Sequence, residues 1–320
     1  MNFLEQLKAQ TVVVADSGDF ESIKQFKPVD TTTNPSLIYA AAKDPKYSYL
    51  IDKAIALARH KTTDKQKQLS FAMDHLFVAF GVEILKIVPG RVSTEVDARL
   101  SFDVEGTVEK AKTLIALYAD AGIDKERILI KVASTWEGIK AAEQLTKEGI
   151  HCNLTLLFCL PQAIACAEAR IRLISPFVGR VLDWYTQNNP GQVYTFENEP
   201  GVQVVKNIYN YYKKFNYKTE VMVASFRNSG EIYELAGCDL MTIAPKLLSE
   251  LEETQGVLER KLDPEKAKLS KLEKISLDEK KFRWLMNQDA MATEKLAEGI
   301  RKFTVDIELL ENMLIEKLSL

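Results

Sequence analysis

Lys131 directly follows three branched aliphatic residues, the Ile-Leu-Ile run at positions 128–130. A lysine in such an apolar run cannot easily reach bulk water, and buried lysines are rare unless they have a partner or a role. Burial disfavours the charged ammonium and so makes the neutral amine available to attack a carbonyl carbon, which gives a Schiff base. The pattern alone leaves open a second interpretation, a structural ion pair with Glu95 or Asp16.

Two carboxylates, Asp16 and Glu95, stand at the ends of other apolar runs and could carry protons for imine chemistry. Breaking a carbon–carbon bond through an imine needs a base for a hydroxyl group, and imine formation needs an acid that expels water. Two carboxylates near one amine can divide that work. Asp16 could instead be a turn residue before Gly18, whereas Glu95, in a buried strand, is harder to explain as a turn or surface residue.

Arg180 and Arg227 lie just beyond two further strand ends and could bind phosphate. A serine hydroxyl, backbone N–H groups and a guanidinium converge at Ser225 and Arg227, as an anion site requires. Each arginine alone would more often be a surface residue, but Ser175 and Ser225 at neighbouring strand ends favour a clamp. The chain has no glycine-rich phosphate loop and no dinucleotide fingerprint, so we expect no nucleotide cofactor.

Asn34, Asn153 and Thr155 are further polar residues at strand ends. Asn153 and Thr155 share a strand face, because side chains alternate along a strand. Asn34 could equally cap a helix that begins at Pro35. Together with the residues above, they predict a polar cup over an apolar floor.

Eight short apolar runs alternate with longer stretches of helical periodicity, as expected of parallel strands joined by helical crossovers. Closure into a (β/α)8 TIM barrel is the economical arrangement, and catalytic groups then gather at the C-terminal ends of the strands. The predicted strands are residues 12–16, 31–34, 92–97, 128–132, 152–157, 173–177, 221–225 and 241–244.

The intervening pattern predicts helices over residues 69–88, 104–121 and 136–147, two of which stop at Gly122 and Gly149. Ser134 and Glu137 have the spacing of a capping box. We expect a loop over residues 187–200. The chain is predicted to form a single barrel domain, residues 1–320, with extra helices that include a C-terminal helical extension, 263–320. The mixed charges of 266–281 indicate a solvated surface.

The composition is that of a globular protein: 46% of the 320 residues are hydrophobic and the net charge is -3. No global positive field attracts nucleic acid or anionic lipid, so we expect neither as a partner. No apolar stretch approaches the roughly 20 residues that span a bilayer. The first eight residues resemble a short amphipathic helix rather than a signal peptide. We therefore expect a cytoplasmic location and no membrane association.

The four cysteines and three histidines show no metal-binding spacing, with no CxxC, HxH or HxxxH arrangement. The cysteines, at positions 152, 159, 166 and 238, are expected to be small buried hydrophobic residues. We expect no metal site and no other cofactor, which argues against a metal-dependent aldolase.

Several segments, in this order, resemble the transaldolase family, and the likeness extends over nearly the whole chain. They include the residues around Asp16, Asn34, Glu95 and Lys131 and continue to residues 297–303 near the C-terminus. The most specific are Thr31-Thr32-Thr33-Asn34-Pro35, Val92-Ser93-Thr94-Glu95-Val96-Asp97, Ile128-Leu129-Ile130-Lys131-Val132, Cys152-Asn153-Leu154-Thr155, Ile174-Ser175-Pro176-Phe177-Val178-Gly179-Arg180 and Ser225-Phe226-Arg227-Asn228.

The resemblance implies a class I aldolase barrel in the pentose phosphate pathway, which moves a dihydroxyacetone unit from sedoheptulose 7-phosphate to glyceraldehyde 3-phosphate. It implies that Lys131 forms the imine, that Asp16 is the acid/base at the cleaved bond, and that Glu95 and Thr155 handle a catalytic water. Sugar and phosphate contacts are implied for Asn34, Thr32, Asn153, Ser175, Phe177, Arg180, Ser225 and Arg227. It further implies phosphorylated sugars as binding partners and a homodimer formed through the C-terminal helices.

Two rival interpretations remain. A barrel of the same family could release dihydroxyacetone instead of transferring it, as a fructose-6-phosphate aldolase does; Glu95, Thr155 and the full-length likeness favour the transferase. A non-catalytic barrel would need Lys131 as a structural ion pair, which the set of Asp16, Glu95 and Lys131 disfavours.

Overall fold

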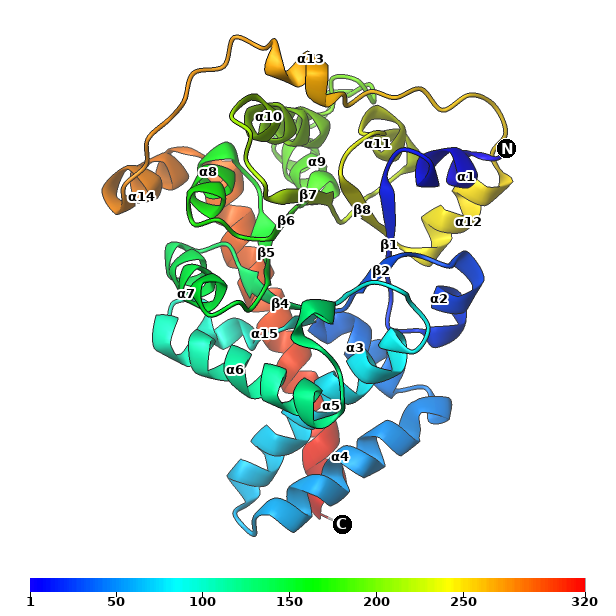
Figure 1. Cartoon of the computed structure of the whole chain (residues 1–320), viewed down its shortest axis with the longest axis vertical. Helices are drawn as coiled ribbons and strands as arrows, with labels where there is room; N and C mark the ends of the chain where they lie inside the picture. Colours follow the sequence, from blue (N-terminus) through cyan, green and yellow to red (C-terminus); the bar gives the residue numbers. More distant parts are fainter. Residues whose placement is uncertain (320) are drawn as a thin grey trace.

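Eight parallel strands close into a barrel in the computed structural model, which describes residues 1–319 apart from the side chain of Ser319 (Figure 1). The order around the barrel is the order in the chain, so each strand pairs with its sequence neighbours and β8 pairs with β1. The predicted (β/α)8 barrel is confirmed. Its strands are β1 Val12–Asp16, β2 Asp30–Thr32, β3 Val92–Glu95, β4 Ile128–Ala133, β5 Cys152–Leu157, β6 Leu173–Pro176, β7 Glu220–Val223 and β8 Leu240–Ile243.

Helices surround the barrel and fill the connections between strands (Figure 1). The predicted helix at 136–147 is found as α7, and those at 104–121 and 69–88 are found as α6 and α5 with slightly different ends. The helices are α1 Phe3–Lys8, α2 Phe20–Phe26, α3 Pro35–Ala42, α4 Ser48–Lys61, α5 Lys65–Leu85, α6 Val104–Asp120, α7 Trp136–Lys147, α8 Leu160–Glu168, α9 Val178–Asn188, α10 Pro200–Lys214, α11 Ser229–Glu234, α12 Pro245–Glu253, α13 Pro264–Lys268, α14 Glu279–Gln288 and α15 Ala290–Ser319.

The inside of the barrel holds an apolar cluster separate from the larger core between the strands and helices. Strand side chains alternate, so Leu129 points the same way as Lys131, and Val14 the same way as Asp16. The cluster therefore forms an apolar floor beneath the polar strand ends. Its members are Val14, Leu129, Leu173, Met222 and Leu240.

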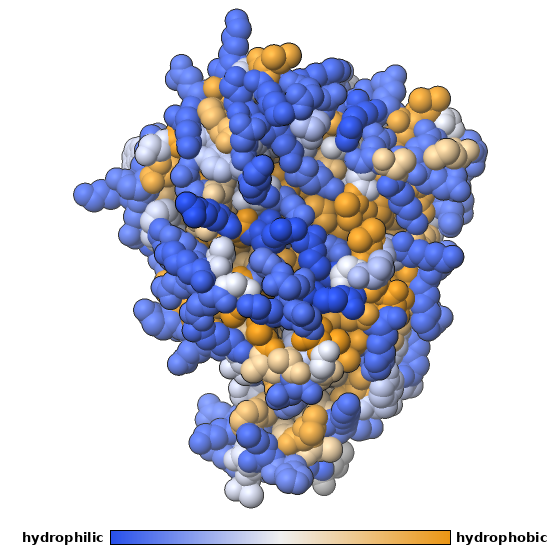
Figure 2. All heavy atoms as spheres, viewed as in Figure 1, coloured by the Kyte–Doolittle hydropathy of each residue, from blue (hydrophilic) through white to orange (hydrophobic). Residues whose placement is uncertain are grey.

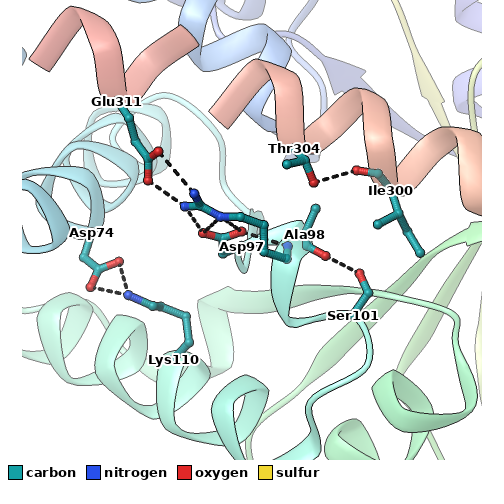
Figure 3. Close-up of polar contacts among 9 residues, drawn as sticks. Asp74, Asp97, Ala98, Ser101, Lys110, Ile300, Thr304 and Glu311 are labelled. Atoms are coloured by element: carbon teal, nitrogen blue, oxygen red, sulfur yellow. Dashed lines mark hydrogen bonds and ion pairs between the residues drawn. The ribbon is translucent and has the colours of Figure 1, made fainter. Parts of the chain in front are cut away.

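The C-terminal helix α15 lies across one end of the barrel, behind the strands in the view of Figure 1, and packs against α3, α5 and α9. Figure 3 shows Glu311 of α15 pointing toward Asp97, which follows β3. The Arg99 guanidinium bridges the two carboxylates, 2.6 Å from each. This bridge ties α15 to the loop that follows Glu95.

Two local expectations need correction. Thr135, not Ser134, caps α7: its hydroxyl accepts the Gly138 N–H, while the Ser134 hydroxyl donates to the Thr155 carbonyl. The loop predicted over 187–200 is shorter, because α9 continues to Asn188 and α10 begins at Pro200. The charged segment 266–281 is mostly exposed, as expected, but it includes part of α13 and the start of α14.

One helix of the described chain, α5, is long and apolar enough to cross a membrane by length and composition alone. The expectation that no apolar stretch approaches that length therefore fails for α5. Most of its apolar window is buried inside the protein, including the fully buried side chains of Leu76, Phe80 and Ile84. A core helix of a globular barrel shows the same pattern.

Candidate active site

Lys131 lies inside the barrel at the C-terminal half of β4, with its side chain 5% exposed. Its Nζ lies 3.0 Å from Glu95 Oε2 and donates a hydrogen bond to the Thr33 carbonyl at 3.2 Å. The β3–β4 register pairs Glu95 directly with Lys131, which explains the ion pair. The structure thus contains the ion pair considered from the sequence, and it also places the amine at the wall of a cavity.

Glu95 is buried and Asp16 is half-buried, and both lie near this amine. Burial raises the pKa of each carboxyl, and the nearby charge of Lys131 partly offsets the rise. Asp16 accepts one side-chain hydrogen bond, from the Thr32 hydroxyl at 3.0 Å. Carboxyl groups with raised pKa values around a buried amine are suited to moving protons near neutral pH.

A cavity of about 50 Å³ opens at the C-terminal ends of the strands. It brings together every residue of the predicted site except Glu95, Asn153 and Arg227. Its lining comprises Asp16, Thr32, Asn34, Lys131, Thr155, Ser175, Phe177, Arg180, Ala224, Ser225, Thr242 and Phe303. Cavities that hold small ligands measure roughly 300–1,000 Å³. A ligand the size of a sugar phosphate therefore requires side chains at the mouth of this cavity to move.

Asn153, Ser175 and Ser93 form a hydrogen-bonded row beneath the cavity. The Ser175 hydroxyl donates to Asn153 Oδ1 at 2.7 Å, and Asn153 Nδ2 donates to the Ser93 hydroxyl at 3.1 Å. Thr155 is different: its Oγ1 is buried and has no hydrogen-bond partner within residues 1–319. This hydroxyl is free to bond to a molecule in the cavity.

Asn34 both caps a helix and lines the cavity, the two roles considered for it from the sequence. Its Oδ1 caps α3 by accepting the Leu37 N–H at 2.9 Å, and the residue also lines the cavity. The cap fixes the side chain and leaves its amide nitrogen as the group available to a ligand.

Arg180 lies at the mouth of the cavity, with its guanidinium 4.9 Å from the Phe177 ring and 5.5 Å from the Phe303 ring. It makes no hydrogen bond or ion pair with the part of the chain that the structure describes. Burial, followed by the charge of Arg227, lowers the pKa of Arg180. A half-buried guanidinium that forms no ion pair is available to bind an anion.

Arg227 stands beside this mouth rather than within the cavity. Its guanidinium pairs with Asp183 at 2.7 Å and contacts the Ser225 carbonyl and hydroxyl at 3.2 and 3.3 Å. Ser225 has a left-handed backbone, with φ 64°, and such strain in a non-glycine residue is often found at ligand-binding turns. The two arginines and Ser225 thus lie close enough to form a clamp for phosphate, although the Asp183 carboxylate already pairs with part of the Arg227 guanidinium.

The family model for transaldolase/fructose-6-phosphate aldolase matches residues 13–314. A probable transaldolase of Drosophila melanogaster is 61% identical over 316 residues, covering 98% of this chain and 95% of that protein. Human transaldolase is 58% identical over 316 residues (98% and 94%), and the transaldolase of Protochlamydia amoebophila is 58% identical over 313 residues (98% and 97%). The chain belongs to the transaldolase/fructose-6-phosphate aldolase family. It is therefore an enzyme, built on the barrel of this family.

Two cavity residues of this transaldolase-family enzyme were not predicted. Thr242 is the next-to-last residue of β8, and its hydroxyl lies within hydrogen-bonding distance, 2.7 Å, of the Thr32 hydroxyl. The Phe303 ring, from α15, lies 5.6 Å from Lys131 Nζ. Thr242 could have been predicted, because it is a polar residue near the C-terminal end of the predicted strand at 241–244. Phe303 lies in a segment that resembles the family, but helical periodicity alone does not show that α15 crosses the barrel mouth.

Other parts of this family member offer less for chemistry. A cavity of about 460 Å³ lies at the opposite end of the barrel, lined by residues such as Val12, Val13 and Asp239, and contains none of the predicted site residues. No group of three or more potential metal-binding side chains lies together within residues 1–319. The four cysteines are buried, and burial raises the pKa of Cys152 to about 12.

Proposed function

We propose that the chain is a transaldolase, which transfers a dihydroxyacetone unit from sedoheptulose 7-phosphate to glyceraldehyde 3-phosphate. The products are erythrose 4-phosphate and fructose 6-phosphate. The observation that carries the proposal is the buried Lys131 amine, 3.0 Å from Glu95 and on the wall of the cavity that also holds Asp16. Family membership supports the same reaction.

The proposed reaction begins when the Lys131 amine attacks the C2 carbonyl of the ketose phosphate. Glu95, within hydrogen-bonding distance, takes a proton from the amine and returns it to the hydroxyl that leaves as water. The product of this step is the imine. Thr155 lines the same cavity, and its unpaired hydroxyl is placed to hold that water.

Cleavage follows from the imine. Asp16 accepts the proton of the C4 hydroxyl while the C3–C4 bond breaks, and the electron pair moves into the imine to give an enamine on Lys131. The aldose phosphate then leaves. An acceptor aldehyde takes the reverse course: the enamine carbon attacks its carbonyl, and Asp16 returns the proton to the new hydroxyl. Hydrolysis of the imine releases the product and restores the amine.

Transfer rather than release requires that water does not protonate the enamine before the acceptor arrives. The small cavity, covered by Phe303 and Arg180, supports this protection. The family also contains fructose-6-phosphate aldolases, so release of free dihydroxyacetone is the alternative reaction. A coupled assay with fructose 6-phosphate distinguishes them. We expect turnover only when erythrose 4-phosphate is present; sustained turnover without it would establish the aldolase.

The phosphate group of the substrate is assigned to Arg180, Ser225 and Arg227, and its sugar hydroxyls to Asn34, Thr32, Asn153, Ser175 and Phe177. Arg180 supports this assignment most strongly, because its guanidinium forms no ion pair or hydrogen bond with residues 1–319, although the charges of Glu298, Glu95 and Asp183 act on it. Asn153 contributes from below the cavity by holding the Ser175 hydroxyl at 2.7 Å.

A cytoplasmic homodimer acting in the pentose phosphate pathway completes the proposal. Val305 and Leu309 on α15 are 52% and 40% exposed, which supports a contact between subunits through the C-terminal helices. Light scattering should give twice the 36.1 kDa chain mass, and a single-chain mass at micromolar concentration would refute the dimer.

A further inference from the structure

Two buried glutamates face each other behind the loop that carries Arg227. Glu199 directly precedes α10 without a side-chain capping hydrogen bond and is 2% exposed, while Glu231 on α11 is fully buried. Three of their four carboxyl oxygens, both of Glu199 and Oε1 of Glu231, have no hydrogen-bond partner among the described residues. The two groups are close enough for a hydrogen bond between them. None of the proposed catalytic steps uses either residue.

Among the described residues, no lysine or arginine side chain forms an ion pair with either glutamate, although the charge of Arg227 partly offsets the raised pKa of Glu231. Cations on the elements that carry the two glutamates already have partners: Arg227 of the β7–α11 loop pairs with Asp183 of α9 at 2.7 Å, and Lys206 of α10 pairs with Glu234 of α11 at 2.8 Å. Arg180 of α9 faces the cavity. Ionised carboxylates only accept hydrogen bonds, so two of them buried face to face are satisfied only when one proton lies between them.

The pair is connected directly to the proposed phosphate site. The remaining carboxyl oxygen, Glu231 Oε2, accepts the backbone N–H of Arg227 at 2.7 Å. The same loop is bonded to the start of α9, where the Gly179 N–H donates to the Ser225 carbonyl at 3.1 Å. A methyl group added to Gly201 would lie only 2.1 Å from the Val178 carbonyl, so α10 begins in close contact with α9. Separation of Glu199 from Glu231 would therefore shift the segments that bear both arginines.

We propose that Glu199 and Glu231 share one proton, that this shared proton fixes the loop bearing Arg227, and that its loss at alkaline pH weakens the binding of phosphorylated sugars. Both glutamates are positioning residues in this account, which rests on the proposed function for the identity of the ligand. Burial, then repulsion by Glu231, raises the pKa of Glu199 to about 8. The shared proton is therefore present at neutral pH and lost as the pH rises through about 8.

The kinetic test compares KM values across this pH range. For fructose 6-phosphate we expect KM to rise by up to about tenfold per pH unit above the pKa, as loss of one proton requires, with kcat much less affected. KM for dihydroxyacetone as an unphosphorylated donor should stay flat. The sugar phosphate itself is already a dianion in this range, since its second pKa is about 6.

Glu199→Gln keeps the size of the side chain and mimics the protonated form. This variant should show a flat KM for fructose 6-phosphate. The control Glu234→Gln, which changes a glutamate on the helix of Glu231 that pairs with Lys206, should keep the alkaline rise. A flat profile in the parent, or a rise that survives in Glu199→Gln, would overturn the positioning role. A parallel rise in KM for dihydroxyacetone would do so as well.

Infrared difference spectra test the shared proton without any turnover. The parent should lose a protonated-carboxyl band as the pH rises through about 8, and Glu199→Gln should lack that change; absence of the band in the parent refutes the shared proton. Failure of the proposed function would appear separately, as no turnover at any pH. In that case the dissociation constant of fructose 6-phosphate, measured by calorimetry over the same pH range, tests the proposal: it should rise above pH 8 in the parent and stay constant in Glu199→Gln.

Discussion

At the N-terminal end of the barrel, arginine side chains beneath the strands are held by ion pairs and hydrogen bonds. Arg91 bonds to Asp30 at 2.7 Å and to Glu220 at 2.8 Å. The Arg127 guanidinium donates to the carbonyls of Gly90 and Val88 at 2.6 and 2.7 Å. Figure 2 shows hydrophilic residues gathered over the centre of the barrel at this end. These contacts satisfy the polar groups and hold the strands in register.

The C-terminal end has similar residue types but leaves polar groups unsatisfied. The Thr155 hydroxyl has no hydrogen-bond partner within residues 1–319. The Arg180 guanidinium contacts the Phe177 and Phe303 rings but forms no ion pair with these residues, and Asp16 accepts a single side-chain hydrogen bond. Buried polar groups that lack partners cost stability, so their concentration at one end indicates a use beyond folding. The contrast distinguishes a stabilising end, where the buried Asp30–Arg91 pair and the Arg127 hydrogen bonds hold the strands, from a chemical end with buried polar groups that lack partners.

The largest effect should come from changing the proton carrier at the chemical end. Asp16→Asn should lower kcat by about 100-fold to 10,000-fold, because the C4 hydroxyl loses its base. The raised pKa of Asp16 means that it is protonated as the pH falls through a value above the ordinary one, so the acid side of the parent pH–rate profile should disappear in the variant. Imine formation should persist. If steady-state kinetics show an unchanged kcat, Asp16 is a turn residue and no more.

At the stabilising end, Arg91→Ala should lower the free energy of unfolding by about 3–5 kcal/mol, because it leaves the buried Asp30 carboxylate unpaired. The kcat per folded molecule should not change. Arg172→Ala is the matched control: Arg172 also pairs with Glu220, at 3.1 Å, but its side chain is 47% exposed, and we expect a cost of about 0–1 kcal/mol. Denaturant titration measures both, and equal costs would remove the distinction between the two ends.

A smaller effect is expected at the proposed phosphate clamp. Arg227→Ala should raise KM for fructose 6-phosphate by roughly tenfold to 100-fold, the value of a hydrogen bond to a charged group of about 1.5–3 kcal/mol. KM for dihydroxyacetone should change far less, since that donor has no phosphate. Asp183→Asn is the useful comparison, because it frees Arg227 and should lower KM for the phosphorylated donor. Equal effects of Arg227→Ala on both substrates would refute the clamp.

The strands and most of the cavity could be predicted because their signals are local. Runs of branched aliphatic residues identify strands, and the alternation of side chains shows that Leu129 and Lys131 share a face. The barrel rule that catalytic groups lie at strand ends then selects Asp16, Glu95 and Lys131. The reaction itself came from family resemblance, since periodicity cannot distinguish one imine chemistry from another.

What the sequence did not reveal depends on contacts between distant segments. Phe303 reaches the cavity because α15 crosses the barrel, which no pattern within α15 predicts. Glu199 fell in a region read as a loop, and its burial follows from the meeting of α10 with α11. Thr135 rather than Ser134 caps α7 because the Ser134 hydroxyl is hydrogen-bonded to the Thr155 carbonyl on β5, a contact between distant segments.

The central claim is that Lys131 is the nucleophile at the incompletely paired end of the barrel. Borohydride reduction in the presence of fructose 6-phosphate, followed by peptide mass mapping, tests it most directly. We predict one irreversible adduct, on the peptide that contains Lys131, and none in Lys131→Met. An adduct on another lysine, or no adduct in the active parent protein, would contradict the claim.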